Sequence, residues 1–263
     1  MTDELDLPRL LGVAEHAARA GGEIVAAQFG SMGNARQKGP GDWVSDVDMA
    51  SEAAVRAALE EAAPSLPVFG EEGGGGRGDV GWFVDPLDGT ANFLHGFPAV
   101  GVSVALVRLG APVVGVVHAP LLDTTYTAAA GSGAFCDGKA ITVSTRDVES
   151  AICATGFPFR AKAERLDEYL PVFEAALRRF EDMRRAGSAS LDLAWTAAGV
   201  FDGYFEQALG PWDVAAGALL VREAGGVVTD WAGDERAWLT SGDMVAGPPA
   251  VHAELLVLTR ATC

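Results

Sequence analysis

Cysteine is scarce in this chain of 263 residues, and its three cysteines, Cys136, Cys153 and Cys263, are scattered without a Cys-x-x-Cys pair. An odd number of scattered thiols argues against a disulfide framework and against a cysteine-based zinc site. The four histidines include no His-x-x-x-His pair, so they do not indicate a zinc site either. We therefore expect reduced thiols and a cytoplasmic protein.

Basic residues and long apolar runs are also in short supply. The chain has 19 lysines and arginines against 36 acids, a net charge of −17, which repels nucleic acid and anionic membranes. No run approaches the length of a membrane span, and residues 1–6 lack the basic start of a signal peptide. We therefore expect no nucleic-acid partner and no membrane association. The same field repels a phosphate ester, so an anionic substrate would need bound cations or local arginines.

Apolar residues make up 49% of the chain, enough for the core of one or two domains. Helical spacing predicts a helix over residues 7–29 and another after Asp48, with a loop at residues 37–41 between them. Asp137-Gly138 is typical of a type I′ hairpin. Short connections between apolar runs predict an antiparallel meander with strands at residues 100–108, 113–118, 124–129 and 134–136.

Past residue 150 the patterns of strands and helices alternate, which is typical of a mixed α/β arrangement. We predict an α+β or mixed α/β fold, a layered α-β-α-β-α sandwich of an antiparallel-sheet half and a mixed-sheet half. The predicted subdomains are residues 1–147, which carry most candidate ligands, and residues 148–263. A ligand site is expected at their interface.

The most informative stretch is residues 82–93, Trp-Phe-Val-Asp-Pro-Leu-Asp-Gly-Thr-Ala-Asn-Phe. Pro86 is expected to end an apolar strand and to place Asp85 and Asp88 in a turn. Carboxylates suit hard cations, and the free N–H groups of the following Gly-Thr suit phosphate. An ordinary surface turn is the alternative. The Asp-x-Asp-Gly-Thr motif of haloacid-dehalogenase-like phosphatases is a poorer match, because two residues separate the acids here.

Residues 85–93, Asp-Pro-Leu-Asp-Gly-Thr-Ala-Asn-Phe, resemble the first signature of the inositol monophosphatase family of Mg-dependent, Li-sensitive phosphatases. Residues 211–217, Pro-Trp-Asp-Val-Ala-Ala-Gly, resemble the second. Residues 70–72, 155–158 and 184–189 also match in order, so the resemblance covers nearly the whole chain. It implies a phosphoric monoester hydrolase, inhibition by Li⁺ and a homodimer.

The resemblance also implies a ligand set for two Mg²⁺ ions, with a third, weaker ion as an option. It assigns Glu71, Asp85 and the Leu87 carbonyl to one ion. Asp85, Asp88 and Asp213 are assigned to a second. Two such ions could clamp the attacking and the leaving oxygen of a phosphate ester.

For catalysis we expect attack by a water activated by the first ion, without a phospho-enzyme. Glu71 and the Thr90 hydroxyl would orient this water. Asp48 matches the family acid that fixes the signature threonine and helps to hold a further metal ion. Helix N-capping is the alternative for Asp48, for Asp46 and for Thr90.

On the substrate side, Glu206 matches the family acid that contacts inositol hydroxyls, although it could also be a solvated strand end. Neighbouring strand residues point to opposite faces, so only one of Arg184 and Arg185 should approach the substrate, and we favour Arg184. Asp192 is left unassigned. The implied substrate contacts are Asp88, Gly89, Thr90, Arg184, Gly187, Ser188, Ala189, Glu206 and Asp213.

We therefore predict Mg-dependent hydrolysis of a small phosphorylated polyol, first of all myo-inositol monophosphate. Histidinol phosphate, NADP and 3′-phosphoadenosine phosphate are alternatives, although no cluster of aromatic and basic residues for a nucleotide is evident. From another class, the chain could be an inactive metal-binding scaffold. The glycine-rich residues 73–78, next to Glu71, are expected to form a mobile loop, either a flap over the site or a plain linker.

Overall fold

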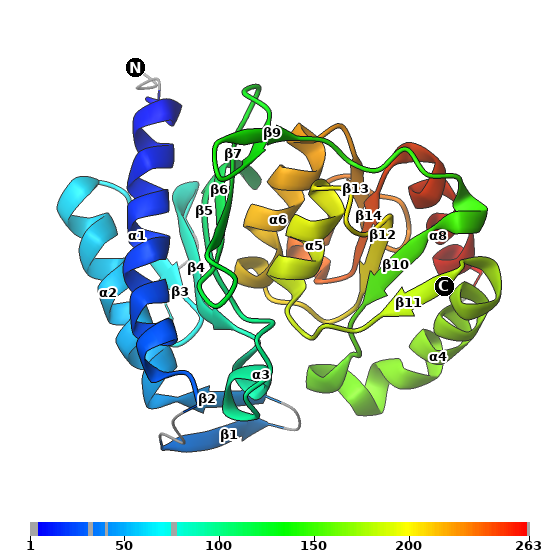
Figure 1. Ribbon diagram of the computed structural model, residues 1–263, viewed down its shortest axis with the longest axis horizontal. Coiled ribbons are helices and arrows are strands. Elements are labelled where there is room, and N and C mark those ends of the chain that lie inside the picture. The colour runs from blue at the N-terminus through cyan, green and yellow to red at the C-terminus, as the bar shows by residue number, and fades with distance from the viewer. Residues whose placement is uncertain (1–4, 31–33, 40–41, 75–77, 262–263) are drawn as a thin grey trace.

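The computed structural model describes residues 5–30, 34–39, 42–74 and 78–261. Two sheets stand roughly side by side, with helices on the outer side of each and a pair of helices between them (Figure 1). This arrangement confirms the predicted α-β-α-β-α sandwich. Among the helices described, none combines the length and the apolar character needed to cross a membrane.

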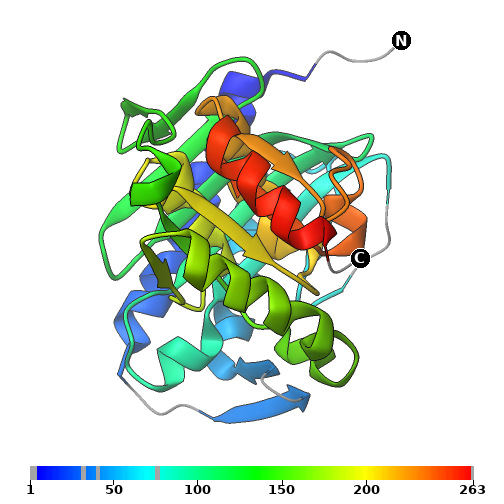
Figure 2. The same cartoon turned by 90° about the vertical axis from the view of Figure 1, so that its right-hand side faces the viewer.

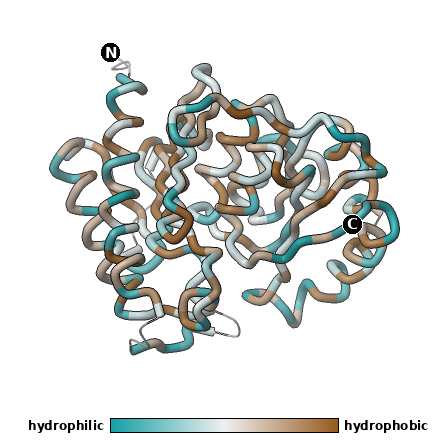
Figure 3. The backbone as a smooth tube through the Cα atoms, viewed as in Figure 1, coloured by the Kyte–Doolittle hydropathy of each residue, from teal (hydrophilic) through white to brown (hydrophobic). Residues whose placement is uncertain are grey.

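The first layer consists of α1 (Leu7–Gln28) and α2 (Asp46–Ala62), which pack on each other and on one face of the larger sheet. Small residues let the two helices approach closely. A Cβ atom added at Gly21 would lie 2.7 Å from the Ser51 hydroxyl oxygen. Figure 3 shows hydrophobic and hydrophilic residues alternating along α1 and α2, as expected of helices with one face in solvent.

The larger sheet has seven strands in the order β3-β4-β5-β6-β7-β8-β9. All pairs are antiparallel except β3 and β4, which confirms the predicted meander. Asp137 and Gly138 have φ values of 47° and 73°, as a type I′ turn requires. The strands are β3 (Val68–Gly70), β4 (Val80–Asp88), β5 (Gly101–Arg108), β6 (Ala111–Ala119), β7 (Thr124–Ala129), β8 (Ala134–Cys136) and β9 (Lys139–Ile141).

Strand β4 does not stop at Pro86, so the turn expected there is wrong. Asp85 pairs with Ser103 and Asp88 pairs with Gly101, which leaves one extra residue on β4. Such a bulge tolerates a proline, because the extra residue is not part of the hydrogen-bond ladder. Both acids therefore belong to the end of a buried strand, whose neighbours fix their positions.

The loop expected at residues 37–41 is also wrong in part. Residues 37–39 belong to β1 (Ala35–Gly39), which pairs antiparallel with β2 (Asp42–Ser45) in a separate two-stranded sheet. Residues 40–41 lie outside the described residues. Because most side chains of β1 are exposed, its sequence lacks the apolar alternation that identifies a strand.

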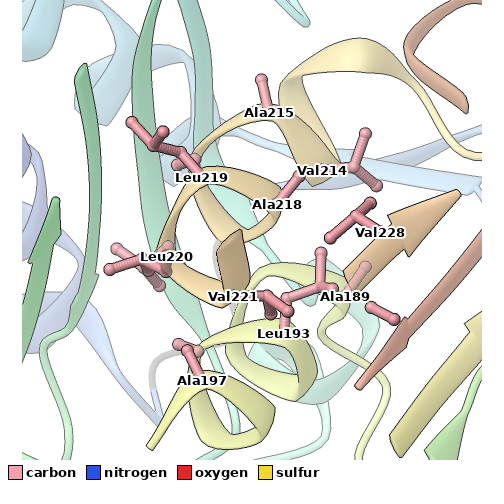
Figure 4. Packing of buried hydrophobic residues seen from close by; sticks show 14 of the residues in the cluster. Ala189, Leu193, Ala197, Val214, Ala215, Ala218, Leu219, Leu220, Val221 and Val228 are labelled. Atoms are coloured by element: carbon pink, nitrogen blue, oxygen red, sulfur yellow. The ribbon is translucent and has the colours of Figure 1, made fainter. Parts of the chain in front are cut away.

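The central layer consists of α5 (Ala189–Ala197) and α6 (Pro211–Glu223), and both helices are almost entirely buried. Figure 4 shows Leu193 and Ala197 of α5 close to residues of α6 such as Val221. Helix α6 packs directly on the larger sheet. This contact matters for function because α6 begins with Pro211-Trp212-Asp213, the start of the second signature-like motif.

The second sheet has the order β11-β10-β12-β14-β13, and it is mixed, as predicted. β10 is parallel to β11 and β12, whereas β14 is antiparallel to β12 and β13. Its strands are β10 (Ile152–Thr155), β11 (Asp182–Arg184), β12 (Gly203–Glu206), β13 (Val227–Thr229) and β14 (Met244–Gly247). Helices α4 (Lys162–Arg179) and α8 (Pro249–Arg260) run across its outer face (Figure 2).

The remaining elements are short: α3 (Thr90–Leu94), η1 (Val148–Ser150), η2 (Phe159–Ala161) and α7 (Trp238–Ser241). The larger sheet ends with β9 and the second begins with β10, so each sheet is built from a continuous part of the chain. The subdomain boundary between residues 147 and 148 stays a prediction.

Candidate functional site

A pocket opens where β4 and β12 end and where α3, α5 and α6 begin. Residues from both halves of the chain line it. The predicted site residues in its wall are Glu71, Asp85, Leu87, Asp88, Gly89, Thr90, Gly187, Ala189, Glu206 and Asp213.

Three carboxylates in this pocket form one cluster. Glu71 follows β3, Asp85 lies near the end of β4 and Asp213 is in the first turn of α6, and one oxygen from each lies within 4.8 Å of the others. Burial, followed by repulsion from Asp213, raises the pKa of Glu71 to about 7. Burial and the nearby Glu71 raise the pKa of Asp85 well above its usual range. A cation among these groups would offset both effects.

The oxygen atoms of Asp213 fit such a cation. Oδ2 accepts a hydrogen bond from the Gly210 backbone N–H at 2.7 Å. Oδ1 is buried and has no hydrogen-bond partner among the described residues. A buried carboxylate oxygen without a partner is costly. Because Mg²⁺ prefers oxygen ligands, the three acids satisfy the chemistry of a magnesium site.

Asp88 lines the same pocket but lies outside the cluster of three acids. Its Oδ2 accepts hydrogen bonds from the Ser188 hydroxyl at 2.7 Å, the Ser190 backbone N–H at 2.7 Å and the Ser190 hydroxyl at 2.6 Å. Burial and repulsion from Asp213 raise its pKa to about 6, although these hydrogen bonds favour the ionised form. Asp88 therefore also connects the end of β4 to the start of α5.

Thr90 and Asp48 are joined directly. The Thr90 hydroxyl lies 2.8 Å from Asp48 Oδ1 and 3.1 Å from the Leu87 carbonyl oxygen. Asp48 Oδ2 accepts from the Ser45 backbone N–H at 2.8 Å, so Ser45 is the N-cap of α2 and Asp48 completes a capping box. The N-cap of α2 is thus neither Asp46 nor Asp48, although Asp48 takes part in capping from the N3 position. Gly89 is the N-cap of α3, so the capping alternative proposed for Thr90 is wrong.

Glu206 faces the pocket from the end of β12. Its Oε2 accepts a hydrogen bond from the Tyr204 hydroxyl at 2.6 Å. Burial raises its pKa to about 7. A Cβ atom added at Gly156 would meet the Glu206 carboxylate at 2.0 Å, so the two segments are in close contact.

The structure corrects the choice between the two adjacent arginines. Arg185, not Arg184, lines the pocket, and its guanidinium lies over the rings of Phe157 and Phe159 at 5.4 and 5.2 Å. The exposed Arg184 binds Asp182, its neighbour on the same face of β11, at 2.5 Å. Alternation along the strand separates the two arginines correctly, but it does not show which face meets the pocket.

Two cationic residues at the site were not predicted. Arg160 on η2 binds Asp213 Oδ2 at 2.5 Å and Glu71 Oε1 at 3.3 Å. Lys38 on β1 lies 3.0 Å from the same Glu71 oxygen and 2.6 Å from Glu72. The net negative charge indicated that bound cations or local arginines would be needed, but nothing in the spacing singled out these residues.

The described residues include only the two ends of the glycine-rich segment. Residues 75–77, in the middle of the expected flap, lie outside the described residues. The segment starts from a fixed point, because Glu52 accepts hydrogen bonds at 2.9 Å from the backbone N–H groups of Glu72 and Gly73. A flap at residues 73–78 stays a prediction.

The layered fold therefore places a cluster of three acids, a candidate site for a divalent metal ion, in an open pocket. A model of the inositol monophosphatase family matches residues 6–262, and the chain therefore belongs to that family. The family supports Mg-dependent phosphatase activity.

Individual relatives agree with this assignment. The chain is 42% identical over 257 residues to the Nus factor SuhB of Escherichia coli K12. The aligned part covers 95% of this chain and 96% of that relative. The solved extragenic suppressor protein suhB of Bartonella henselae is 36% identical, with a TM-score of 0.91 and coverage of 97% and 99% of the two chains. An IMPase of Thermotoga maritima is 33% identical, with a TM-score of 0.88 and coverage of 96% and 97%.

Proposed function

We propose that this protein hydrolyses a small phosphorylated polyol, with myo-inositol monophosphate as the first candidate, in a reaction that depends on Mg²⁺. The observation that carries the proposal is the cluster of Glu71, Asp85 and Asp213 with the buried, unpartnered Oδ1 of Asp213. Four such acids in one pocket, counting Asp88, would be hard to keep ionised without cations.

The proposed ligands of two or three Mg²⁺ ions are Glu71, Asp85, Asp88, Asp213 and the Leu87 carbonyl. When bound, Mg²⁺ supplies charge neutralisation and lowers the pKa of the attacking water. The protein must then place its own groups around the phosphate. No phospho-enzyme is expected, so none of the carboxylates acts as the nucleophile.

Thr90 is the residue that we propose to orient the attacking water together with Glu71. Asp48 holds the Thr90 hydroxyl at 2.8 Å, which fixes the direction of its lone pairs. Asp48 is itself fixed by the capping box of α2. The Thr90 hydroxyl is therefore held by a residue of a helix rather than by one of a loop.

The other end of the pocket suits a hydroxylated leaving group. Glu206 lines this end of the pocket together with Gly187, and its carboxylate offers hydrogen-bond acceptors, which suit the hydroxyl donors of a polyol. A carboxylate in this wall disfavours a second anionic group nearby. This argues for a neutral polyol over NADP or 3′-phosphoadenosine phosphate, while histidinol phosphate remains an alternative.

A turnover panel tests the proposal. Phosphate release would be measured for inositol, histidinol, sugar and nucleotide phosphates at fixed Mg²⁺, with EDTA as the reference. We expect inositol monophosphate to be hydrolysed fastest, and Asp85→Asn to lower kcat by at least about a hundredfold because a shared ligand is lost. Asp182→Asn, on the exposed end of β11, is the matched control and should keep full turnover.

Equal turnover in EDTA, or no release from any ester, would contradict the enzyme and favour the inactive scaffold. A ranking led by a nucleotide would overturn only the substrate. Trapping of a phospho-aspartate would contradict attack by water.

A second function is supported by the names of the relatives, because proteins 42% identical over 95% of this chain are called Nus factors. Restoration of Nus-factor function in an Escherichia coli strain without its own SuhB would test this role. Asp85→Asn should restore it as well as the parent chain if the role is separate from catalysis.

A homodimer also stays a proposal, to be checked by light scattering.

A further inference from the structure

We propose that Arg160 is a built-in competitor of the metal ions, whose guanidinium must leave the acidic cluster before its carboxylates can bind Mg²⁺. The segment η2 would then set the metal affinity of the site. The inference rests on the metal site of the proposed function, and it concerns a residue outside both signature-like motifs.

The contacts of Arg160 fall on two of the three carboxylates in the acidic cluster. Nη1 lies 2.5 Å from Asp213 Oδ2, and Nη2 lies 3.3 Å from Glu71 Oε1. The planar guanidinium therefore bridges two of the three clustered acids with separate N–H groups. An ion bound to both acids would meet the arginine at close range, and the repulsion between like charges disfavours that arrangement.

Arg160 and the two acids that it contacts differ in how exposed their side chains are. The side chain of Arg160 is 38% exposed, whereas those of Asp213 and Glu71 are 4% and 10% exposed. Asp213 is fixed by the first turn of α6 through its bond from Gly210. Arg160 lies on the short 3₁₀ turn η2, none of whose residues is buried, so we expect the guanidinium rather than the buried acids to move when a metal ion binds.

Competition of this kind is a coupling between two occupants of one site, and it must act in both directions. If Mg²⁺ displaces the guanidinium, then the guanidinium weakens Mg²⁺ binding by the same factor. Lys38 shares Glu71 Oε1 with Arg160 at 3.0 Å, so it adds to the competition from the β1 side. Once displaced, Arg160 stays beside the pocket, where its charge can face an anionic substrate.

Direct metal binding tests this inference without any turnover. Mg²⁺ binding would be followed by calorimetry, and Mn²⁺ binding by electron paramagnetic resonance, on the full chain without substrate. We expect Arg160→Gln to bind both ions about tenfold more tightly, a typical size for coupling between sites. Arg184→Gln removes the same charge from an exposed side chain bound to Asp182, and it should match the parent.

Arg160→Lys provides a second variant that keeps the charge. A single ammonium group cannot span two acids in the way that a guanidinium does, so we expect an affinity between those of the parent and Arg160→Gln. Thermal unfolding in EDTA would check that each variant is folded. If Arg160→Gln does not fold, tighter binding by Arg160→Lys carries the test.

The outcomes separate the inference from the proposed function. If the parent binds Mg²⁺ and Arg160→Gln binds it equally or more weakly, Arg160 is not a competitor, although the metal site stands. If neither the parent nor Arg160→Gln binds either ion, both proposals fail. Tighter binding by Arg160→Gln and Arg184→Gln alike would indicate a general charge effect and would overturn the specific role of Arg160.

Discussion

At the scale of single residues, Glu206 makes a contribution to stability that depends on pH. Burial raises its pKa to about 7, compared with the ordinary value of 4.5 that applies to the unfolded chain. Between these values the unfolded chain loses the proton while the folded protein keeps it, so the folded state binds more protons and stability falls as the pH rises. Below pH 4.5 both forms are protonated, and the penalty disappears.

We therefore predict that Glu206→Gln gains stability over the parent as the pH is raised from 4.5 to 8. The gain should approach about 2–3 kcal/mol at pH 8, reduced by the partial exposure of the side chain. Urea unfolding at a series of pH values would measure it. Glu61→Gln, at an exposed helix position, is the control and should show no such trend. A constant difference between Glu206→Gln and the parent would contradict the assigned pKa.

At residue level, the sequence pointed to pocket residues where a side chain belongs directly to a motif. Asp85, Thr90 and Asp213 line the pocket as expected, because strand ends and helix starts fix their positions. Arg160 and Lys38 escaped prediction because they are cations on irregular or exposed elements, with no local pattern that links them to the acids. Only the fold brings together residues that lie so far apart in sequence.

At the scale of elements, the distance between α6 and β6 decides where Asp213 lies. A Cβ atom added at Gly115 would come within 2.9 Å of the Ala216 carbonyl oxygen and 3.0 Å of its Cα atom. Backbone atoms cannot move aside as the tip of a side chain can. A glycine in β6 therefore allows the helix that carries Asp213 to pack directly on the sheet.

Gly115→Ala should push α6 outward, with a loss of about 1–3 kcal/mol of stability, the usual cost of overpacking. Mg²⁺ affinity should fall as well, because Asp213 moves with the helix. Gly12→Ala is the matched control: its added Cβ meets nothing within 4 Å, and alanine favours a helix, so stability should be unchanged or slightly higher. Wild-type stability and metal affinity in Gly115→Ala would show that the packing contact is soft.

Most elements were predictable because their apolar periodicity is strong. The strands of the meander match to within two or three residues, since each has a buried face. Two predictions about elements were wrong, the turn at Pro86 and the loop at residues 37–41. Both relied on the rule that glycine and proline normally indicate turns. Gly39 is part of an exposed strand and Pro86 of a bulge, and in both cases pairing with a neighbouring strand outweighs local preference.

At the scale of the whole molecule, the acidic site joins two parts of the chain that form separate sheets. Asp85 belongs to the larger sheet and Glu71 directly follows its strand β3, whereas Asp213 comes from the central helix layer. The order of strands and helices predicted the layers of the sandwich. It did not predict how the layers are oriented at the pocket, which depends on contacts such as that between Asp88 and Ser190.

A metal that bridges these parts should stabilise the entire fold, because the unfolded chain cannot hold the acids together. At a free Mg²⁺ concentration of 100 times Kd, binding adds about 2.7 kcal/mol. For a chain of this length that corresponds to a rise in Tm of about 5–10 °C. Differential scanning fluorimetry in EDTA and in increasing Mg²⁺, at constant ionic strength and pH 8, would measure the rise.

The net charge of −17 makes one control essential, because any salt screens the repulsion among 36 acids and can raise Tm by itself. NaCl at matched ionic strength gives this general effect, and we expect Mg²⁺ to exceed it. The excess should vanish in Asp213→Asn, which removes a clustered ligand but leaves the surface charge nearly unchanged. Equal effects of Na⁺ and Mg²⁺ on the parent would mean that the clustered acids do not select a divalent ion.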